Sequence, residues 1–463
     1  MANSRGGFSN RLGFILAAAG SAVGLGNIWK FPFEVRDGGG AAFVVMYLGF
    51  CFILCTPVMA TEIAIGRHTS KDPVGAFRKL GHKKWSFIGI MGVIAGMLIL
   101  SFYNVVAGWT LGFAIEMFQG NFEVGSNFGS FVADWKTTGA YATAFMLATA
   151  FIVSNGVSAG IEKASKILMP TLLVMVLGLM LYALSLPGSA EGLYYYLVPN
   201  FSAITMETVY GALGQAFFSL SLGMGTLLTY GSYISKKENI ITSSAFITIA
   251  DVGIAFIGGL MMFSFLGFVA HEQNSSIMDF KGGAGMIFML LPGSFSSLGP
   301  VLGSIIGGVF FVLLSFAALT STVSLLEVPV AFVVDEMKVE RKKAVWGVAA
   351  IIFAIGMPSL MSAGGVEFFT EIHFMDWVEN IASNTMLPLG GFLISIYGAY
   401  VWKKKNLYAE IAEGNPNFKY TLLAKYMEFA LKYLCPVILG SITIVTIFDK
   451  FLGIDLLGLV IGQ

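Results

Sequence analysis

Two glycine-rich stretches inside apolar segments carry the residues of this chain that could bind small ions or molecules. Residues 20–27 place three glycines in seven positions beside the side-chain oxygens of Ser21 and Asn27. Glycine weakens a helix, and unpaired backbone groups in lipid are costly. A break there would expose amides on one side, which suit anions, and carbonyls on the other, which suit cations. Close packing of glycines is the alternative.

The second stretch repeats the pattern. Leu222-Gly223-Met224-Gly225 lies in the sixth apolar segment, as Val23-Gly24-Leu25-Gly26 lies in the first. These places correspond if segments 1–5 and 6–10 are repeats, and because five is odd the two halves must be inverted relative to each other. Interrupted segments in matching positions of inverted halves indicate a binding site near the membrane midplane.

The elements that must position these stretches are membrane spans. The 463 residues are 56% hydrophobic and 12% charged, with a mean hydropathy of +0.79 and no net charge. This composition indicates a membrane protein with many spans and excludes a nucleic-acid partner. Hydropathy predicts eleven spans, at 11–33, 41–66, 86–118, 139–155, 162–185, 206–234, 240–270, 300–334, 343–358, 376–402 and 420–449.

The predicted fold is therefore all-α, with an inverted repeat of 5+5 helices, broken first and sixth helices, and one extra C-terminal helix. We expect one transmembrane domain over 1–463, divided into repeats 1–185 and 206–402 and an additional span 420–449. Basic residues concentrate in alternate connections, beginning with 67–84, which puts the amino terminus in the cytoplasm and the carboxyl terminus outside. The polar opening residues do not fit a signal peptide, and we expect the inner (plasma) membrane.

Other chemistries find little support. We interpret Cys51, Cys55 and Cys435 as packing residues within apolar segments, and the four histidines lack ligand spacing. A nucleophile–base set, a metal cluster and a cofactor loop are all missing from the sequence, so we expect no enzyme and no organic cofactor. A channel is disfavoured because neither break repeats a filter sequence.

Long motifs resemble one family, the neurotransmitter:sodium symporters, and within it the bacterial amino-acid transporters with eleven spans. The match runs through nearly the whole chain, and its most specific pieces are Arg11-Leu12-Gly13, residues 20–27 with Phe31-Pro32, Gly38-Gly39-Gly40, residues 109–113, residues 214–221, and residues 317–322 followed by Glu327 and Pro329. The resemblance implies the inverted-repeat fold and solute uptake coupled to the sodium gradient, with a lipid bilayer and a small-molecule amino-acid substrate as partners.

The resemblance also implies two sodium sites. The first would use the Ala22 carbonyl, Asn27, Ser219, Asp251 and the carboxylate of the substrate. The second would use the Gly20, Val23 and Ala317 carbonyls with Thr320 and Ser321. The residues agree in part, because 320–322 is a hydroxyl run in an apolar span. The alternative is hydrogen bonding of these hydroxyls to the preceding helical turn.

Asp251 is a departure from the chloride-dependent relatives, which have a neutral amide there and a serine four residues later, where this chain has Ala255. A carboxylate inside a span is costly and functional by default. A fixed negative charge beside sodium would replace chloride, so we predict chloride-independent transport, with Tyr47, Gln215 and Ser219 hydrogen-bonded to Asp251. A protonated, structural aspartate is the alternative.

The substrate is inferred at Gly24, where relatives that carry monoamines have an aspartate that pairs with the amine. Glycine leaves room for a substrate with its own carboxylate. By resemblance, Tyr103 binds that carboxylate and closes with Phe218. Met224, which replaces a bulky aromatic of leucine-type relatives, allows larger side chains. The expected substrate site comprises Ser21, Ala22, Gly24, Leu25, Gly26, Ile99, Tyr103, Phe218, Ser219, Ser221, Met224, Ser321 and Leu325.

Alternating access needs gates, and the resemblance places an outer ion pair at Lys30 and Asp376. Lys30 stands where the family usually has arginine, and lysine cannot form a bidentate fork, so this pair is expected to be weaker. The inner gate would be Arg5 and Asp335 with Tyr233 nearby. Ordinary positive flanking of a span is the alternative for both basic residues.

We therefore predict a sodium-coupled symporter for neutral, hydrophobic or aromatic L-amino acids. The alternatives are a sodium symporter for a non-α-amino acid of the taurine or GABA type, and a non-transporting amino-acid sensor. The sequence leaves open the exact amino acid, the sodium stoichiometry, proton exchange, the choice between monomer and homodimer, the effect of the absent twelfth span, and the partners of Glu62 and Glu327.

Overall fold

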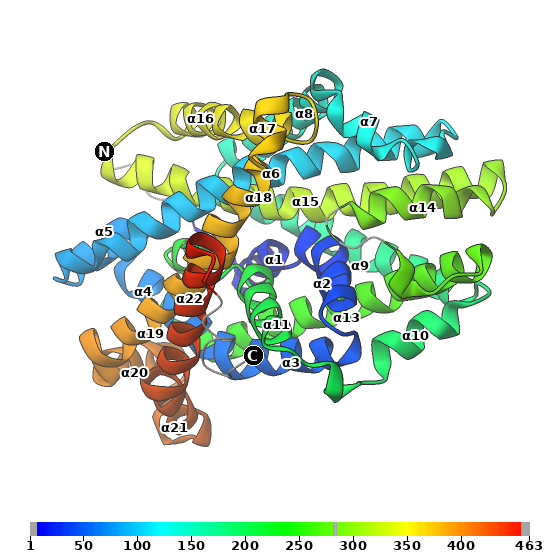
Figure 1. Cartoon of the computed structure of the whole chain (residues 1–463). Helices are drawn as coiled ribbons and strands as arrows, with labels where there is room; N and C mark the ends of the chain where they lie inside the picture. The colour runs from blue at the N-terminus through cyan, green and yellow to red at the C-terminus, as the bar shows by residue number, and fades with distance from the viewer. Residues whose placement is uncertain (1–6, 281–282, 284, 455–463) are drawn as a thin grey trace.

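The computed structural model describes residues 7–280, 283 and 285–454, and the regular secondary structure of this part of the chain is all helical, joined by turns and loops (Figure 1). By length and composition, eight of its helices can cross a membrane, and two further spans appear when each bent helix pair is counted as one. The predicted sixth span is missing from that count because it is divided into two helices that are each too short. The all-α prediction is confirmed for these residues.

The first five spans begin with a broken one. Helix α1 (Arg11–Ala22) and the segment Gly26–Asp37, which comprises η1 (Gly26–Lys30) and α2 (Phe31–Asp37), meet at a bend of 42°. Asn10 caps α1 because its side chain accepts a hydrogen bond from the Gly13 amide at 2.9 Å. The following spans are α3–α4 (Ala41–Thr69), α6 with η3 (Lys83–Phe118), α8 (Trp135–Ser154) and α9 with η5 (Val157–Leu184).

The sixth to eleventh spans contain the second break. Helix α11 (Met206–Ser219) starts at a capping box formed by Thr205 and Thr208, and six residues separate its end from the start of α12 (Thr226–Gly231). In Figure 1, α1 and α11 lie near the middle of the bundle. The remaining spans are α13 (Ile240–Gln273), α15 (Pro300–Glu336), α16 (Arg341–Met361), α18–η9 (Phe374–Val401) and α21–α22 (Leu422–Leu452).

Several connections that hydropathy left outside the spans are also helical. Helix α14 (Met286–Ser296) is apolar but too short to count as a span, and α20 (Lys403–Gly414) leaves the tenth span at 99°. The other short helices are α5 (Pro73–Lys79), α7 (Phe128–Ala133), α10 (Ser189–Leu197) and α17 (Glu367–Glu371).

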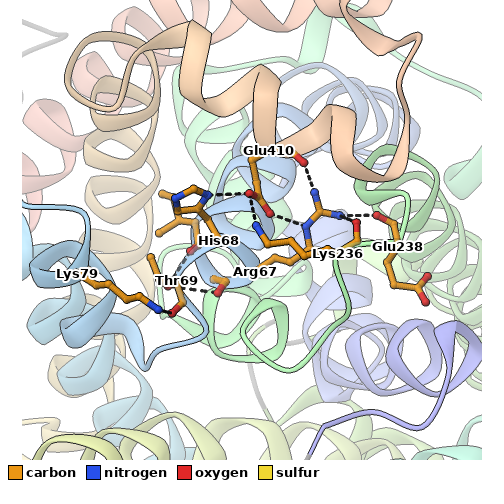
Figure 2. Close-up of polar contacts among 9 residues, drawn as sticks. Arg67, His68, Thr69, Lys79, Lys236, Glu238 and Glu410 are labelled. Carbon is orange, nitrogen blue, oxygen red and sulfur yellow. Dashed lines mark hydrogen bonds and ion pairs between the residues drawn. The ribbon is translucent and has the colours of Figure 1, made fainter.

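A buried polar cluster fastens α20 to the end of α4. Figure 2 shows the Glu410 carboxylate between Arg67, His68 and Lys236. Arg67 Nε donates to Glu410 Oε1 at 2.7 Å, while Lys236 Nζ and His68 Nδ1 lie 2.6 and 2.7 Å from Oε2. Arg67 also donates to the Glu238 carbonyl at 2.5 Å. Because the side chains of Arg67 and Glu410 are 0% and 2% exposed, they depend on each other for compensation of charge. We call Arg67, His68, Lys236 and Glu410 the Glu410 cluster.

Candidate functional site

The first helix break gives its freed backbone groups new partners. The Gly24 amide donates to Asn27 Oδ1, and the Leu25 amide donates to the Tyr103 hydroxyl, both at 2.9 Å. The Gly26 carbonyl accepts from Gln215 Nε2 at 2.7 Å. Side chains thus satisfy the two freed amides, while the Gly26 carbonyl also accepts the Phe31 amide of the following helix. Such compensation is the condition for irregular backbone at membrane depth.

The second break is a tight reversal between α11 and α12. Gly223 and Gly225 have φ of +78° and +77°, and Ser221 has φ of +54°. Glycine adopts this left-handed conformation without strain, which explains why two of the three positions carry it. The Gly223 amide donates to Glu62 Oε1 at 2.9 Å, so this break too is supported by a side chain from α4.

The two breaks line one cavity with about 300 Å³ of space between its atoms, part of which is open to the surroundings. Hydrogen bonds connect the helices in its polar part, because Ser21 Oγ lies 3.0 Å from Ser221 Oγ and 2.7 Å from Ser324 Oγ. Its aromatic part includes Tyr103 and Phe218, whose ring centroids are 6.5 Å apart. Eleven of the thirteen predicted substrate residues line it: Ser21, Ala22, Gly26, Ile99, Tyr103, Phe218, Ser219, Ser221, Met224, Ser321 and Leu325.

Gly24 and Leu25, the two other predicted substrate residues, do not line this cavity. Gly24 lies directly behind it, where an added Cβ atom would come 2.1 Å from Ser321 Oγ and 2.9 Å from the Tyr103 hydroxyl. Leu25 is buried and reaches the site through its backbone amide. Their contribution is thus through close approach and hydrogen bonding, not through side-chain contact.

The Asp251 carboxylate lies beside the cavity, fully buried and surrounded by donors. Asn27 Nδ2 donates to its Oδ1 at 2.7 Å, the Ser219 hydroxyl lies 2.9 and 3.0 Å from its two oxygens, and the Tyr47 hydroxyl donates to Oδ2 at 3.1 Å. The predicted hydrogen bond from Gln215 to Asp251 is wrong. The Gln215 side chain donates instead to the Gly26 carbonyl, which also accepts the Phe31 amide within the following helix.

Oxygens of the predicted second sodium site lie together between α1 and α15. Thr320 Oγ1 lies 3.2 Å from the Val23 carbonyl and 2.9 Å from the Ala317 carbonyl. Gly20 packs here as well, since an added Cβ atom would lie 3.6 Å from Thr320 Cβ. The Ser321 hydroxyl donates to a carbonyl in the last turn of α1 at 3.2 Å. A hard cation prefers such oxygen-only surroundings.

The outer ion pair differs from the prediction. Lys30 Nζ contacts Glu379 Oε1 at 2.7 Å and lies 4.7 Å from the centre of the Phe218 ring, whereas Asp376 lies 3.8 Å from His373. The side chain of Lys30 is 4% exposed and that of Asp376 is 73% exposed, so the buried ammonium is paired with the less exposed acid. The partner of Lys30 is therefore Glu379, and not Asp376 as predicted.

One of the predicted inner residues, Tyr233, lies at Glu327, an acid for which the sequence indicated no partner. Glu327 pairs with Arg341, whose Nη2 lies 2.5 Å from Oε2, and accepts from the Tyr233 hydroxyl at 2.7 Å. Asp335 accepts a hydrogen bond from the Asp72 amide at 3.1 Å. Arg5, the predicted inner basic residue, lies outside the described residues. The sequence contains a signal for the pairing of Glu327 with Arg341, because Glu327 is a carboxylate in an apolar span and the arginine follows fourteen residues later.

Two interrupted helices around a partly polar cavity within a bundle of membrane spans define a class, the secondary transporters. The model of the sodium:neurotransmitter symporter family matches residues 5–141 and 132–451. The chain belongs to this family, and it is accordingly a sodium-dependent symporter.

Similar proteins cover almost the whole chain. An uncharacterised sodium-dependent transporter of Bacillus subtilis, YhdH, is 32% identical over 459 residues, covering 96% of this chain and 98% of the relative. The human sodium- and chloride-dependent GABA transporter 2 is 26% identical, covering 88% and 75%. A crystal structure of MhsT in complex with L-phenylalanine superposes with a TM-score of 0.86 and 39% identity, covering 95% of this chain and 99% of that one. The likeness to MhsT confirms the predicted inverted-repeat fold.

Proposed function

We propose that this protein imports neutral hydrophobic or aromatic L-amino acids together with sodium, by alternating access and without chloride. The observation that carries this proposal is the lining of the cavity between the two breaks. It contains hydroxyls and backbone at one part and the apolar side chains of Ile99, Phe218, Met224 and Leu325 at another, and none of the described residues that line it is charged. An α-amino acid brings its own two charges to such a site, and its apolar side chain needs no ionic partner.

The position of Gly24 supports a substrate that carries its own carboxylate. An aspartate there would begin with a Cβ atom 2.1 Å from Ser321 Oγ, so the site has no room for a side chain that pairs with an amine. The substrate carboxylate would meet the Tyr103 hydroxyl, which lies next to the Leu25 amide. The bound L-phenylalanine in the MhsT structure supports the aromatic end of the proposed range.

Asp251 supports the absence of a chloride requirement. A buried carboxylate held by Asn27, Ser219 and Tyr47 supplies a fixed negative charge next to the proposed first sodium site. Two sodium ions are proposed, one near Asn27 and Asp251 and one near Thr320. We place the protein in the plasma membrane, with its amino terminus in the cytoplasm, on the distribution of basic residues.

The alternative substrate class is a non-α-amino acid, because relatives at about a quarter identity are named as GABA and taurine transporters. A longer distance between amine and acid would need a pocket in which the apolar part is shorter. Met224 and Leu325 line the apolar part of this pocket. This lining favours an α-amino acid with a large apolar side chain.

The test is uptake by proteoliposomes of labelled leucine, phenylalanine, tryptophan, GABA and taurine. The inward sodium gradient is compared with a potassium gradient, and chloride with gluconate. Sodium-driven accumulation of the hydrophobic amino acids that is unchanged in gluconate is the expected result. Accumulation of GABA or taurine alone would establish the alternative class, and loss of uptake in gluconate would contradict the role of Asp251. Sodium-dependent binding without accumulation would identify a sensor.

A further inference from the structure

A second cavity, with about 230 Å³ of empty space, lies beside the second helix break. One of its lining side chains is titratable or charged, namely that of Glu62 on α4. The other lining residues are contributed by α5, α6, the second break with α12, and α19: Pro73, Phe77, Ile88, Gly89, Gly223, Gly225, Leu228 and Ile394. The chamber is therefore apolar apart from one carboxyl group and the backbone of the break.

Glu62 is incompletely satisfied in this chamber. The residue is 1% exposed, and its Oε1 accepts the Gly223 amide at 2.9 Å. Its Oε2 is buried and has no hydrogen-bond partner among the described residues. Asp251, by contrast, receives donors on both oxygens from Asn27, Ser219 and Tyr47. Burial of an ionised carboxylate with a single donor costs much more free energy than burial of the neutral acid.

The surroundings favour a proton over a metal cation as the ligand of Glu62. Sodium needs several oxygens around it, and this lining offers one side-chain carboxyl among apolar side chains. A proton needs only Oε2, and the resulting carboxylic acid is neutral and needs no ionic partner in the apolar lining. The only bond formed is O–H, with the proton taken from the aqueous phase and returned to it.

The backbone of the second break connects this chamber to the substrate cavity. Ser221 and Met224 line the substrate cavity, while Gly223 and Gly225, their neighbours in the chain, line the chamber of Glu62. The Gly223 amide is also the donor that Glu62 accepts. A ligand that displaces the backbone at Met224 would move this donor relative to Oε1, and a donor to a carboxylate favours its charged form. We propose that Glu62 is a proton-binding site whose proton affinity changes when substrate binds.

By linkage, proton binding at Glu62 must change substrate affinity in the same measure. The inference rests on the proposed function only for the choice of probe, which is L-phenylalanine in the presence of sodium. Infrared difference spectra of the full-length protein in liposomes, recorded on adding L-phenylalanine, report protonated carboxyl groups directly. Calorimetric titration of the same samples reports whether the ligand binds.

In wild-type protein we expect a change in the carbonyl band of a protonated carboxylic acid, which shifts when glutamate is labelled with ¹³C. The band should be absent in Glu62→Gln, which keeps an oxygen for the Gly223 amide but cannot be protonated in this way. It should persist in Glu327→Gln, the matched control, because that acid is paired with Arg341.

A wild-type protein that binds L-phenylalanine without a glutamate band overturns the proton site and leaves the proposed function intact. A wild-type protein that does not bind contradicts the proposed function instead. If Glu62→Gln fails to fold, Glu62→Asp replaces it, and there the band must lose its response to glutamate labelling. A band that still responds to that labelling also overturns the inference.

Discussion

Substitution of Gly24 by alanine tests the geometry of the first break most directly. The added Cβ atom would lie 2.1 Å from Ser321 Oγ, 2.9 Å from the Tyr103 hydroxyl and 3.2 Å from Ser321 Cβ. Overpacking of this kind costs about 1–3 kcal/mol. Since Ser321 and Tyr103 line the substrate cavity, we expect this cost to fall on substrate binding. About 1.4 kcal/mol corresponds to a factor of ten, so substrate should bind roughly 5-fold to 140-fold more weakly in Gly24→Ala than in wild type.

The assay is calorimetric titration of L-phenylalanine in sodium, with the unfolding temperature of each variant measured in parallel. Gly214→Ala is the matched control, since Gly214 lies on the other broken span and an added Cβ atom there would have no atom within 4 Å. We expect Gly214→Ala to bind within about twofold of wild type. Unchanged affinity in Gly24→Ala, or an equal loss in both variants, would refute the reasoning.

Three further predictions concern charged groups. Glu379→Gln removes the partner of buried Lys30 and should reduce accumulation in proteoliposomes, whereas Asp376→Asn should not; the opposite order would restore Asp376 as the outer acid. Asp251→Asn combined with Ala255→Ser should make uptake rise with chloride in a chloride titration, and a flat response would contradict the fixed-charge argument. Burial raises the pKa of Glu410, but hydrogen bonds from Lys236, Arg67 and His68 outweigh it and hold that pKa below its ordinary value of 4.5. Its stabilisation is therefore present above that value and lost as pH falls through the lowered pKa. The difference in unfolding temperature between wild type and Glu410→Gln should stay constant down to about pH 5 and shrink below it, and a constant difference at all pH values would be the contrary result.

The sequence predicted the helical class and the place of both breaks because glycine and lipid impose strong local rules. The glycines at 24, 26, 223 and 225 indicate helix breaks without knowledge of any tertiary contact. Resemblance to the family was sufficient to match the hydroxyl of Thr320 with backbone carbonyls. Such features depend on residues that are close together in the chain, and a single sequence shows these directly.

Pairings across the fold could not be read in the same way. Asp376 and Glu379 lie three residues apart on one helix, so either could face Lys30 until the packing of that helix is known. Arg67 and Glu410 are separated by 343 residues, and the residues around either one give no indication that the two form an ion pair. The role of Gln215 depends on which backbone carbonyl of the first break lies within reach of its side chain, a detail that the glycine pattern alone does not determine.

The fixed position of the Asp251 carboxylate has a consequence for energy coupling. Under the proposed function, a neutral amino acid and sodium cross the membrane while the compensating negative charge stays in the protein. Each sodium ion then moves one uncompensated elementary charge, which at 100 mV is worth about 2.3 kcal/mol. Uptake should therefore be driven by the membrane voltage as well as by the sodium concentration difference, and a cell that loses its voltage would lose part of its capacity to concentrate the substrate even with its sodium gradient intact.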